Sequence, residues 1–225
     1  SSSTHKGSGN LPKKRDTQDL APRNAPVQDR SRARSKQIID VTGELLERVG
    51  FDDLNTILIA KEVGISIGSL YHYFPNKHAI LYAMGSRWLE GVEAALDEIA
   101  SWPVEEMALD ELVEKMLSVK LKVYRQQKAI LTLVQAMFSV PQLRELDLQH
   151  DELEISRMAA VFKRMGINRH VKERERLARL FLETTHSVFL VVVNQKGERA
   201  KRTLADLNLM ICMLLRQHLS DSAAE

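Results

Sequence analysis

The segment 66–77 places several hydrogen-bonding side chains close together. Tyr71, His72 and Tyr73 are consecutive, and Lys77 follows shortly after them. Hydroxyl and imidazole groups can hydrogen-bond to base edges or to phosphate oxygens, and an ammonium group makes a charge-assisted contact with phosphate. Side chains of these types in one short segment therefore favour nucleic-acid binding.

Enzymatic chemistry finds no comparable support in the sequence. The chain has no phosphate-cradling glycine loop, no HExxH motif and no nucleophile with an evident base and orienting group. Its histidines form no pair at metal-ligand spacing and have no cysteine nearby. We therefore expect no enzymatic activity, no metal site and no cofactor.

Cysteine usage and hydropathy indicate the compartment. The single cysteine, Cys212, cannot form an internal disulfide, which fits a reducing cytoplasm, and its apolar surroundings predict an inert buried thiol. No apolar run is long enough to cross a bilayer, and the polar N-terminus does not resemble a signal peptide. We expect a cytoplasmic protein without a membrane partner.

Two short helices joined at a glycine would position the candidate DNA-binding groups. Thr56 is a suitable N-cap for a helix that runs to Val63, and Gly64 can adopt the left-handed conformation that ends it. Ser66 can cap the next helix, and Asn76 the one after that. This pattern predicts a helix-turn-helix. The apolar positions expected to face its core are Ile57, Val63, Ile65 and Leu70.

Residues 56–81 closely resemble the DNA-binding domain of TetR-family transcriptional regulators, above all in SIGSLYHYFPNK at 66–77 and AIL at 79–81. The resemblance covers about residues 34–81, and only a compatible helical layout follows. In that family the third helix enters the major groove, the tyrosines and the following lysine hold phosphates, and the C-terminal domain binds a small ligand and dimerises. The resemblance implies DNA-binding roles for Thr56, Ile67, Gly68, Ser69, Tyr71, His72, Tyr73 and Lys77.

Several of these roles have structural alternatives. Lys77 is either a phosphate contact or an ordinary exposed lysine, and its place in the first turn of a helix, where anions bind, favours the contact. Tyr71 and Tyr73 could instead belong to the core, and Tyr73 is the better candidate for a partly structural role. His72 could hydrogen-bond a base edge, contact phosphate or face solvent.

Positive charge is concentrated at the N-terminus. Residues 1–36 contain nine Lys and Arg and three Asp, whereas the whole chain carries a net charge of only +2. A basic arm before a helix-turn-helix can enter a minor groove or lie along phosphates, and the alternative is a solvated tail. We expect a disordered basic tail over residues 1–29 and a DNA contact at Arg34.

The rest of the chain predicts helices, so we expect an all-α fold. A helix-turn-helix DNA-binding domain of three helices would cover residues 30–82, and a helical ligand-binding and dimerisation domain residues 83–220. Gly43 would be a weak point in the first helix or a close contact, and Gly85 a hinge or a tolerated crossing glycine. Besides the two short helices, the expected helices are 32–49, 77–100, 110–127, 129–140, 141–165, 171–194 and 204–219.

The last two predicted helices indicate self-association. Residues 204–219 carry apolar side chains on nearly every side, and a helix of this kind must be buried all round. TetR-family proteins, which this chain resembles, form their dimer interface from their last two helices. We therefore expect a homodimer through residues 171–194 and 204–219. A membrane hairpin is the rival interpretation, but charged residues flank runs that are too short to span a bilayer.

Polar groups among apolar neighbours mark the expected ligand pocket. Pockets are mostly apolar with a few oriented polar groups, although each such residue is individually more typical of ordinary core. We expect a small-molecule inducer of lipophilic or aromatic character. The candidate ligand-binding residues are Tyr124, Gln135, Met137, Phe138, Phe162, Thr185, His186 and Phe189.

These features together predict a ligand-responsive transcriptional regulator. We expect a homodimer that binds a pseudo-palindromic operator in double-stranded DNA, as a repressor released by a small molecule. An activator, or a regulator without a ligand, is a nearer alternative. It would differ from this repressor only in the direction of regulation or in lacking the response to a small molecule. The alternative from another class is a helical partner-binding or ligand-sequestering protein with an unused helix-turn-helix, whose affinity for DNA would not survive competitor DNA.

Overall fold

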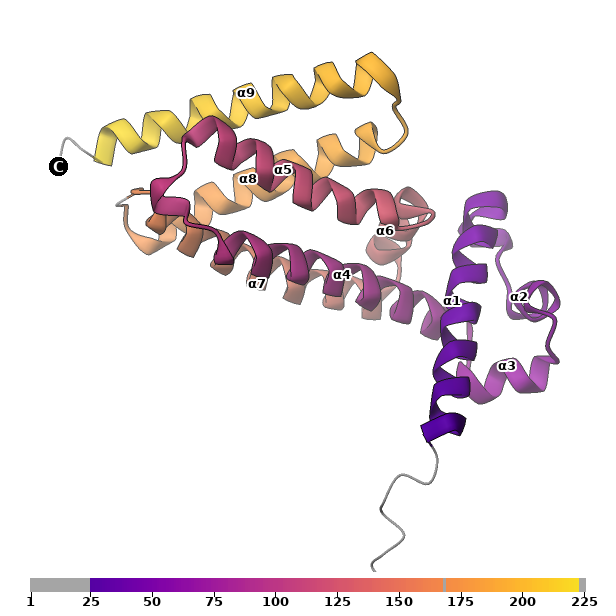
Figure 1. Cartoon of the computed structure of the whole chain (residues 1–225). Helices are drawn as coiled ribbons and strands as arrows, with labels where there is room; N and C mark the ends of the chain where they lie inside the picture. The colour runs from indigo at the N-terminus through magenta and orange to yellow at the C-terminus, as the bar shows by residue number, and fades with distance from the viewer. Residues whose placement is uncertain (1–24, 168, 223–225) are drawn as a thin grey trace, which may run out of the picture. The chain divides into compact units, whose positions relative to one another are not determined.

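A computed structural model describes residues 25–167 and 169–222 of the chain. Every regular element in this part is helical, which confirms the expected all-α fold (Figure 1). The elements are α1 (Ala25–Asp53), α2 (Thr56–Val63), α3 (Ile67–Tyr73), α4 (Lys77–Ser101), the 3-10 turn η2 (Val104–Glu106), α5 (Leu109–Gln126), α6 (Ile130–Ser139), α7 (Pro141–Arg164), α8 (Val171–Val192) and α9 (Gly197–Ser222).

The first helix begins earlier than the sequence pattern predicts. It starts at Ala25 instead of residue 32, so residues 25–29 are helical and the prediction of a disordered tail was wrong for them. Pro26 does not oppose this, because a proline is tolerated in the first turn, where its missing N–H has no helical partner anyway. The rest of the expected tail, residues 1–24, lies outside the described residues. At the other end Gly50, with φ 78°, interrupts the helix directly after residue 49, as expected.

The boundary between two structural units falls inside α1, after Lys36. The first unit contributes only the first turns of α1 to the described residues, and Gln37–Glu225 contains the other helices. In this second unit, α1, α2, α3 and the beginning of α4 share buried side chains, which include Ile38, Leu46, Ile59, Leu70 and Ile80. These contacts fix the small helices that the candidate DNA-binding groups require.

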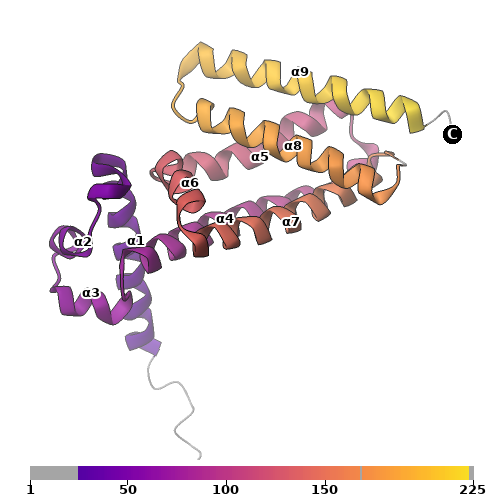
Figure 2. The same ribbon diagram turned by 180° about the vertical axis from the view of Figure 1, so that it is seen from behind.

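Helices α4 to α9 form a layered bundle. The two opposite views show α4 and α7 side by side, with α5 and α8 in the next layer and α9 packed on both of these (Figures 1 and 2). The short α6 packs on α7 and α4. Large aromatic side chains fill the interior, and the Phe162 and Phe181 rings meet edge to face at 5.9 Å between centroids. Within the described ranges, no helix combines the length and apolarity that crossing a membrane requires.

Helix bounds from α4 to α8 agree with the sequence pattern to within two residues, but α9 begins at Gly197 instead of residue 204. Its first turns, from Glu198 to Thr203, are polar and mostly exposed, so they carry no apolar period that marks a helix. Gly197, with φ 62°, allows the chain to turn from α8 into α9.

Two helical glycines pack against neighbouring elements at different distances. A Cβ atom on Gly43 would lie 3.2 Å from Cβ of Lys128, so α1 closely approaches the loop between α5 and α6. A Cβ atom on Gly85 would meet side-chain atoms of Leu143 and Met137 at 3.6 and 3.7 Å, which is ordinary contact distance. The structure therefore favours a close contact for Gly43 and a helix crossing for Gly85.

Candidate nucleic-acid interface and ligand cavity

Helix α2 begins one residue away from the predicted cap. Asn55, in an extended conformation, is the N-cap, and its Oδ1 accepts a hydrogen bond from the Leu58 backbone N–H at 2.9 Å. The prediction that Thr56 caps this helix was wrong, because asparagine is at least as good a cap and precedes it. Thr56 is the first helical residue instead, and its hydroxyl lies 3.1 Å from the Tyr71 hydroxyl of α3.

The turn between α2 and α3 has the predicted local chemistry. Gly64 adopts φ 81° and ψ 33°, and its N–H donates to the Ala60 carbonyl at 2.9 Å. The Ile65 N–H reaches the same carbonyl at 3.0 Å, which closes the end of α2. Ser66 then caps α3, since its Oγ accepts from the Ser69 N–H at 3.1 Å. These bonds fix the direction in which α3 leaves the turn.

Helix α3 buries one side chain and exposes a row of others. Leu70 is fully buried and anchors the helix in the core. The exposed residues of α3 are Ile67, Gly68, Ser69, Tyr71 and His72, and Tyr73 is half-buried. The half-burial of Tyr73 and its edge-to-face contact with His72, 5.4 Å between ring centroids, agree with a partly structural role. Helix α3 therefore presents hydroxyl, imidazole and apolar groups to solvent around a single anchor.

Ile57 is the core prediction that the structure contradicts. Its side chain is 73% exposed, whereas Ile59, Ala60 and Val63 form the buried face of α2. Residue 57 lies two positions before residue 59, so the helical period turns it away from the core. The exposed Ile57 therefore adds an apolar group to the surface of α2, which the sequence pattern did not predict.

Lys77 has intramolecular partners that the sequence did not predict. Its Nζ donates to the backbone carbonyls of Phe51 at 3.2 Å and Leu54 at 2.9 Å, and it lies 4.5 Å from the centroid of the Phe51 ring. Asn76 caps α4 as expected, with its Oδ1 accepting from the Ala79 N–H at 2.9 Å. Lys77 thus ties the end of α1 to the beginning of α4, and its phosphate contact stays a prediction.

Arg34 lies in the part of α1 that belongs to the first structural unit. Its side chain is partly exposed. Its DNA contact also stays a prediction.

Three of the eight candidate ligand-binding residues line one cavity. Tyr124, Phe138 and His186 face a cavity of about 150 Å³ between α4, α5, α6, α7 and α8. The Tyr124 hydroxyl lies 2.5 Å from Nδ1 of His186, and its ring meets that of Trp88 edge to face at 5.5 Å. Polar tips and aromatic faces thus converge there, as expected of a ligand site.

The other five candidates lie elsewhere. Gln135 is exposed on α6, and Met137 is buried against Gly85. Thr185 is buried, but its hydroxyl donates to carbonyls of its own helix, with the Phe181 oxygen at 2.8 Å. Phe162 and Phe189 are fully buried packing residues, as single aromatic residues in apolar stretches usually are.

The acidic wall of this cavity was not predicted from the sequence. The side chains that line it without having been predicted include Trp88, Asp147, His150, Asp151, Glu154, Arg179 and Glu183. Asp147, Asp151 and Glu154 are spaced i, i+4 and i+7 on α7, which places them on one face of the helix. That spacing was available in the sequence, but a charged helical face is usually solvated, and only the packing of α8 encloses this one.

Burial sets the protonation of these groups. Burial raises the pKa of Asp151 to about 7, and the neighbouring carboxylates of Asp147, Glu154 and Glu183 add to the rise. Burial likewise raises the pKa of Asp147 and of the Tyr124 hydroxyl. It lowers the pKa of His186, so its imidazole is neutral near pH 7. Within the described ranges, no group of His, Cys, Asp and Glu side chains has an arrangement that could hold a metal ion.

Family models match both parts of the chain. A model described as "Bacterial regulatory proteins, tetR family" matches residues 38–84, and "Tetracyclin repressor-like, C-terminal domain" matches residues 108–215. The chain is 33% identical over 70 residues to the HTH-type transcriptional repressor KstR of Mycolicibacterium smegmatis, covering 31% of this chain and 34% of that protein. It is 34% identical over 65 residues to the HTH-type transcriptional regulator BetI of Vibrio campbellii, covering 29% and 33%. The matches thus span about a third of these curated relatives.

Solved structures share the fold over most of the chain. GusR of Salmonella enterica superposes with a TM-score of 0.64 at 21% identity, covering 89% of this chain and 100% of that one. The TetR-family regulator PfmR of Thermus thermophilus superposes with a TM-score of 0.61 at 18% identity, covering 77% and 96%. At these identities the likeness shows the fold alone. With both family models matched in order, the chain belongs to the TetR family of transcriptional regulators, which are not enzymes.

Proposed function

We propose that this TetR-family regulator acts in the cytoplasm as a homodimer, binds a pseudo-palindromic DNA operator as a repressor, and is released by a small molecule. The observation that carries the proposal is the exposed row of α3 around the buried Leu70. A helix of this kind, held by a capped turn, fits the major groove, where side chains can reach base edges.

The side chains of the row suggest different contacts. Ser69 and His72 have groups that hydrogen-bond to base edges, and the exposed Ile67 can contact a thymine methyl group. Gly68 lets the backbone approach the DNA closely. The hydroxyls of Thr56 and Tyr71 lie 3.1 Å apart. One hydroxyl can donate to the other, which fixes their geometry, and the second hydroxyl can then donate to a phosphate.

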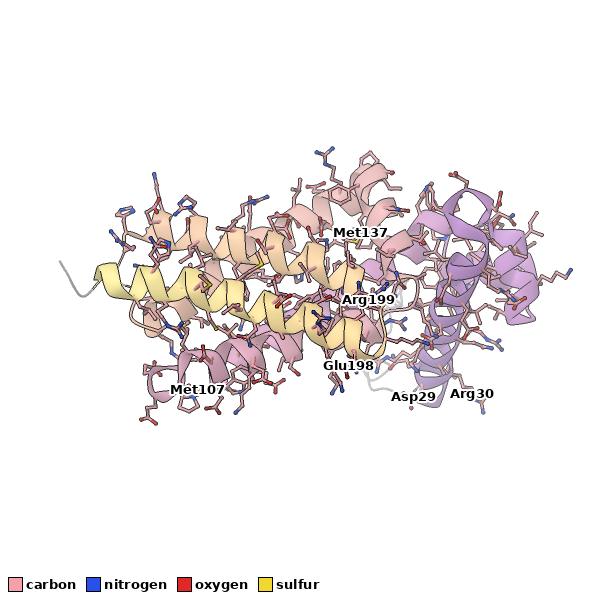
Figure 3. The ribbon with its side chains drawn as sticks, turned by 90° about the horizontal axis from the view of Figure 1, so that it is seen from above. Asp29, Arg30, Met107, Met137, Glu198 and Arg199 are labelled. Atoms are coloured by element: carbon pink, nitrogen blue, oxygen red, sulfur yellow. The ribbon has the colours of Figure 1, made fainter. Side chains whose placement is uncertain are left out.

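Exposed apolar side chains support dimerisation through α8 and α9. Met210 and Met213 on α9 are 59% and 61% exposed, although the opposite face of the same helix packs in the core. We call the surface made by Leu180, Val191, Leu209, Met210 and Met213 the α8–α9 face. Figure 3 looks onto α9 with α8 beside it, and Glu198 and Arg199 label the first turn of α9. Patches of this kind mark sites of association.

Helix α4 provides a physical route from the cavity to the DNA-binding helices. Lys77 at its beginning holds the end of α1, and Arg87 pairs with Asp40 of α1 at 2.8 Å. The next residue, Trp88, lines the cavity. A ligand that prefers a different placement of α4 would move α1 and the turn with it. Release would follow if the two α3 helices no longer matched successive major grooves, roughly 34 Å apart.

Selection from a random duplex library, followed by affinity measurement, tests the proposal. We expect an inverted repeat bound with an affinity of roughly 10⁻⁸ M or better at physiological salt, and an affinity that falls as salt rises. Tyr71→Ala should weaken binding by about tenfold or more, since it removes the hydroxyl paired with Thr56. Tyr82→Ala is the matched control, because Tyr82 is a comparably exposed tyrosine on α4.

Two outcomes would contradict the proposal. An absence of enrichment over bulk DNA would mean that the helix-turn-helix is unused. Equal affinities of the Tyr71→Ala variant and the wild type for the selected site would exclude the proposed docking of α3.

A further inference from the structure

The cavity between α4, α5, α6, α7 and α8 combines aromatic walls with an excess of acidic groups. Trp88 of α4 and Tyr124 of α5 provide ring surfaces, and Phe138 of α6 lines the same space. Trp88 is only 5% exposed, and no group among the described residues accepts a hydrogen bond from its Nε1. The wall of the cavity therefore contains a buried aromatic side chain whose N–H has no partner among the described residues.

The carboxylates of the cavity are incompletely compensated. Glu154 is buried and pairs with Lys120 at 2.5 Å, and Glu183 lies 3.5 Å from Arg179. Within the described part of the chain, neither Asp147 nor Asp151 has a basic nitrogen within 4 Å.

The histidines of the cavity compensate this charge only in part. Burial and Glu183 raise the pKa of Asp147, and His150, whose Nε2 lies 3.9 Å from Glu93, opposes them without outweighing them. Burial keeps the His186 imidazole neutral. Two partly buried carboxylates are thus left facing other carboxylates.

We propose that this cavity binds a small organic cation, with its ammonium group near Asp147 and Asp151 and its apolar part against Trp88 and Tyr124. The inference rests on the proposed function in one respect: the cation is taken to be the small molecule that releases the repressor from its operator. An ammonium group gains both from a carboxylate partner and from the face of a tryptophan or tyrosine ring. This narrows the expectation of a lipophilic or aromatic ligand to one that also carries positive charge.

Other ligand classes fit these walls less well. A neutral lipophilic molecule would remove water from Asp147 and Asp151 without supplying a partner, and burial of an unpaired charge is strongly unfavourable. An anion would be repelled by the same two groups. The volume of about 150 Å³ is comparable to that of a cavity that holds one benzene ring, so the cation is small.

Binding should also change the protonation of the site. Asp151, whose pKa is about 7, is partly protonated at neutral pH, and a cation beside it favours the carboxylate. Asp147, whose pKa is also raised, would respond in the same direction. A proton should therefore leave the protein when the cation binds near pH 7.

Three probes of similar size and different charge test the proposal by titration calorimetry on the full chain. They are 2-phenylethylammonium, the neutral 2-phenylethanol and the anion 3-phenylpropanoate. We expect the ammonium to bind and the other two to bind about tenfold or more weakly, because only the ammonium pairs with the carboxylates. Titration in two buffers of different ionisation enthalpy should reveal the proton released.

Paired substitutions on one helix locate the site. Asp151→Asn should weaken binding of the ammonium by about tenfold and reduce the number of protons released. Glu152→Gln is the control, since it is the adjacent exposed residue of α7 and lies outside the cavity lining. If the Asp151→Asn protein does not fold, Asp147→Asn provides the same comparison.

The inference would be overturned if the ammonium failed to bind at millimolar concentration, if the alcohol bound equally well, or if both substitutions on α7 had the same effect. These titrations contain no DNA, so they are independent of operator binding. Binding of the ammonium by a protein that selects no DNA site would uphold the cavity and refute the proposed function. Operator binding without ammonium binding would refute the cation site and leave the proposed DNA binding intact.

Discussion

Asp151 shows what enclosure does to a single carboxylate. The side chain lies on α7, and its pKa is raised to about 7 by burial first and then by the carboxylates of Asp147, Glu154 and Glu183, while Arg179 acts in the opposite direction. In the unfolded chain the pKa returns to its ordinary value near 3.8. The folded state therefore holds this proton more tightly. Its contribution to stability is complete below about pH 4 and is lost as pH rises through 7.

The pH dependence of stability provides a test at this residue. Asp151→Asn removes the titration, so the variant should gain stability relative to the wild type between pH 5 and pH 8. Because the group is partly exposed, we expect a relative gain of the order of 1 kcal/mol instead of the full value of the pKa shift. Denaturant unfolding at the two pH values measures it. Glu152→Gln should keep the wild-type pH dependence, and a constant difference between Asp151→Asn and wild type would show that Asp151 does not titrate in this way.

The same residues show what a sequence can reveal about a cavity. Tyr124 and His186 could be predicted because they are polar groups in apolar stretches, and they do meet across two helices. Thr185 has the same signature, yet its hydroxyl is satisfied by the backbone of its own helix. Asp147 and Asp151 were missed because a charged helical face looks the same in sequence whether water or another helix covers it.

At the scale of elements, local chemistry fixed the helix-turn-helix well. Gly64, Ser66 and Asn76 act at their predicted places, because capping and left-handed glycines depend on few neighbours. The exposed Ile57 and the polar beginning of α9 were not predicted, since both depend on which face meets a neighbouring helix. The role of Lys77 is a tertiary feature of the same kind, as its partners are more than twenty residues away.

Lys77→Met should separate a structural tie from a phosphate contact. Methionine keeps an apolar stem near Phe51 but cannot donate to the carbonyls of Phe51 and Leu54. Leaving these carbonyls without their charged donor should lower stability by about 1–3 kcal/mol. It should also weaken operator binding without changing the salt dependence. Thermal unfolding and operator titration over a range of salt concentrations measure both effects.

The salt dependence decides between the two roles of Lys77. Loss of a direct phosphate contact reduces the slope of log affinity against log salt by about one. If the Lys77→Met variant shows a smaller slope of log affinity against log salt and unchanged thermal stability, Lys77 is a phosphate contact and not a structural tie. Lys163→Met, at an exposed lysine of α7, controls for the loss of one positive charge and should alter neither property.

At the scale of the whole molecule, the proposed function needs two features. The α8–α9 face would form the dimer, and α4 would couple the ligand cavity to the helix-turn-helix. Helix α4 connects the cavity wall at Trp88 with α1 and the loop after it, through Arg87 and Lys77. In the proposed dimer, a second copy of the chain would supply the other α3 helix. The family could be identified from the motif at 66–77, but sequence alone did not indicate which turns of α8 and α9 remain uncovered.

Met210→Glu tests the α8–α9 face. The side chain is exposed in one chain, so glutamate should leave the fold of that chain intact, whereas a dimer would have to bury the new charge. We expect sedimentation velocity to show monomers for this variant at concentrations where the wild type is dimeric. Leu153→Glu, at an exposed leucine of α7, is the control and should remain dimeric. Dissociation of the Leu153→Glu protein alone would place the interface on α7.

The same variant should reveal how dimerisation affects DNA binding. A single chain presents one α3 helix, so Met210→Glu should lose the gain in affinity that comes from binding both half-sites at once. Its affinity for a duplex with one half-site should equal that of the wild-type monomer, because α3 itself is unaltered. A Met210→Glu protein that is monomeric yet binds the full inverted repeat as tightly as wild type would separate operator recognition from the α8–α9 face.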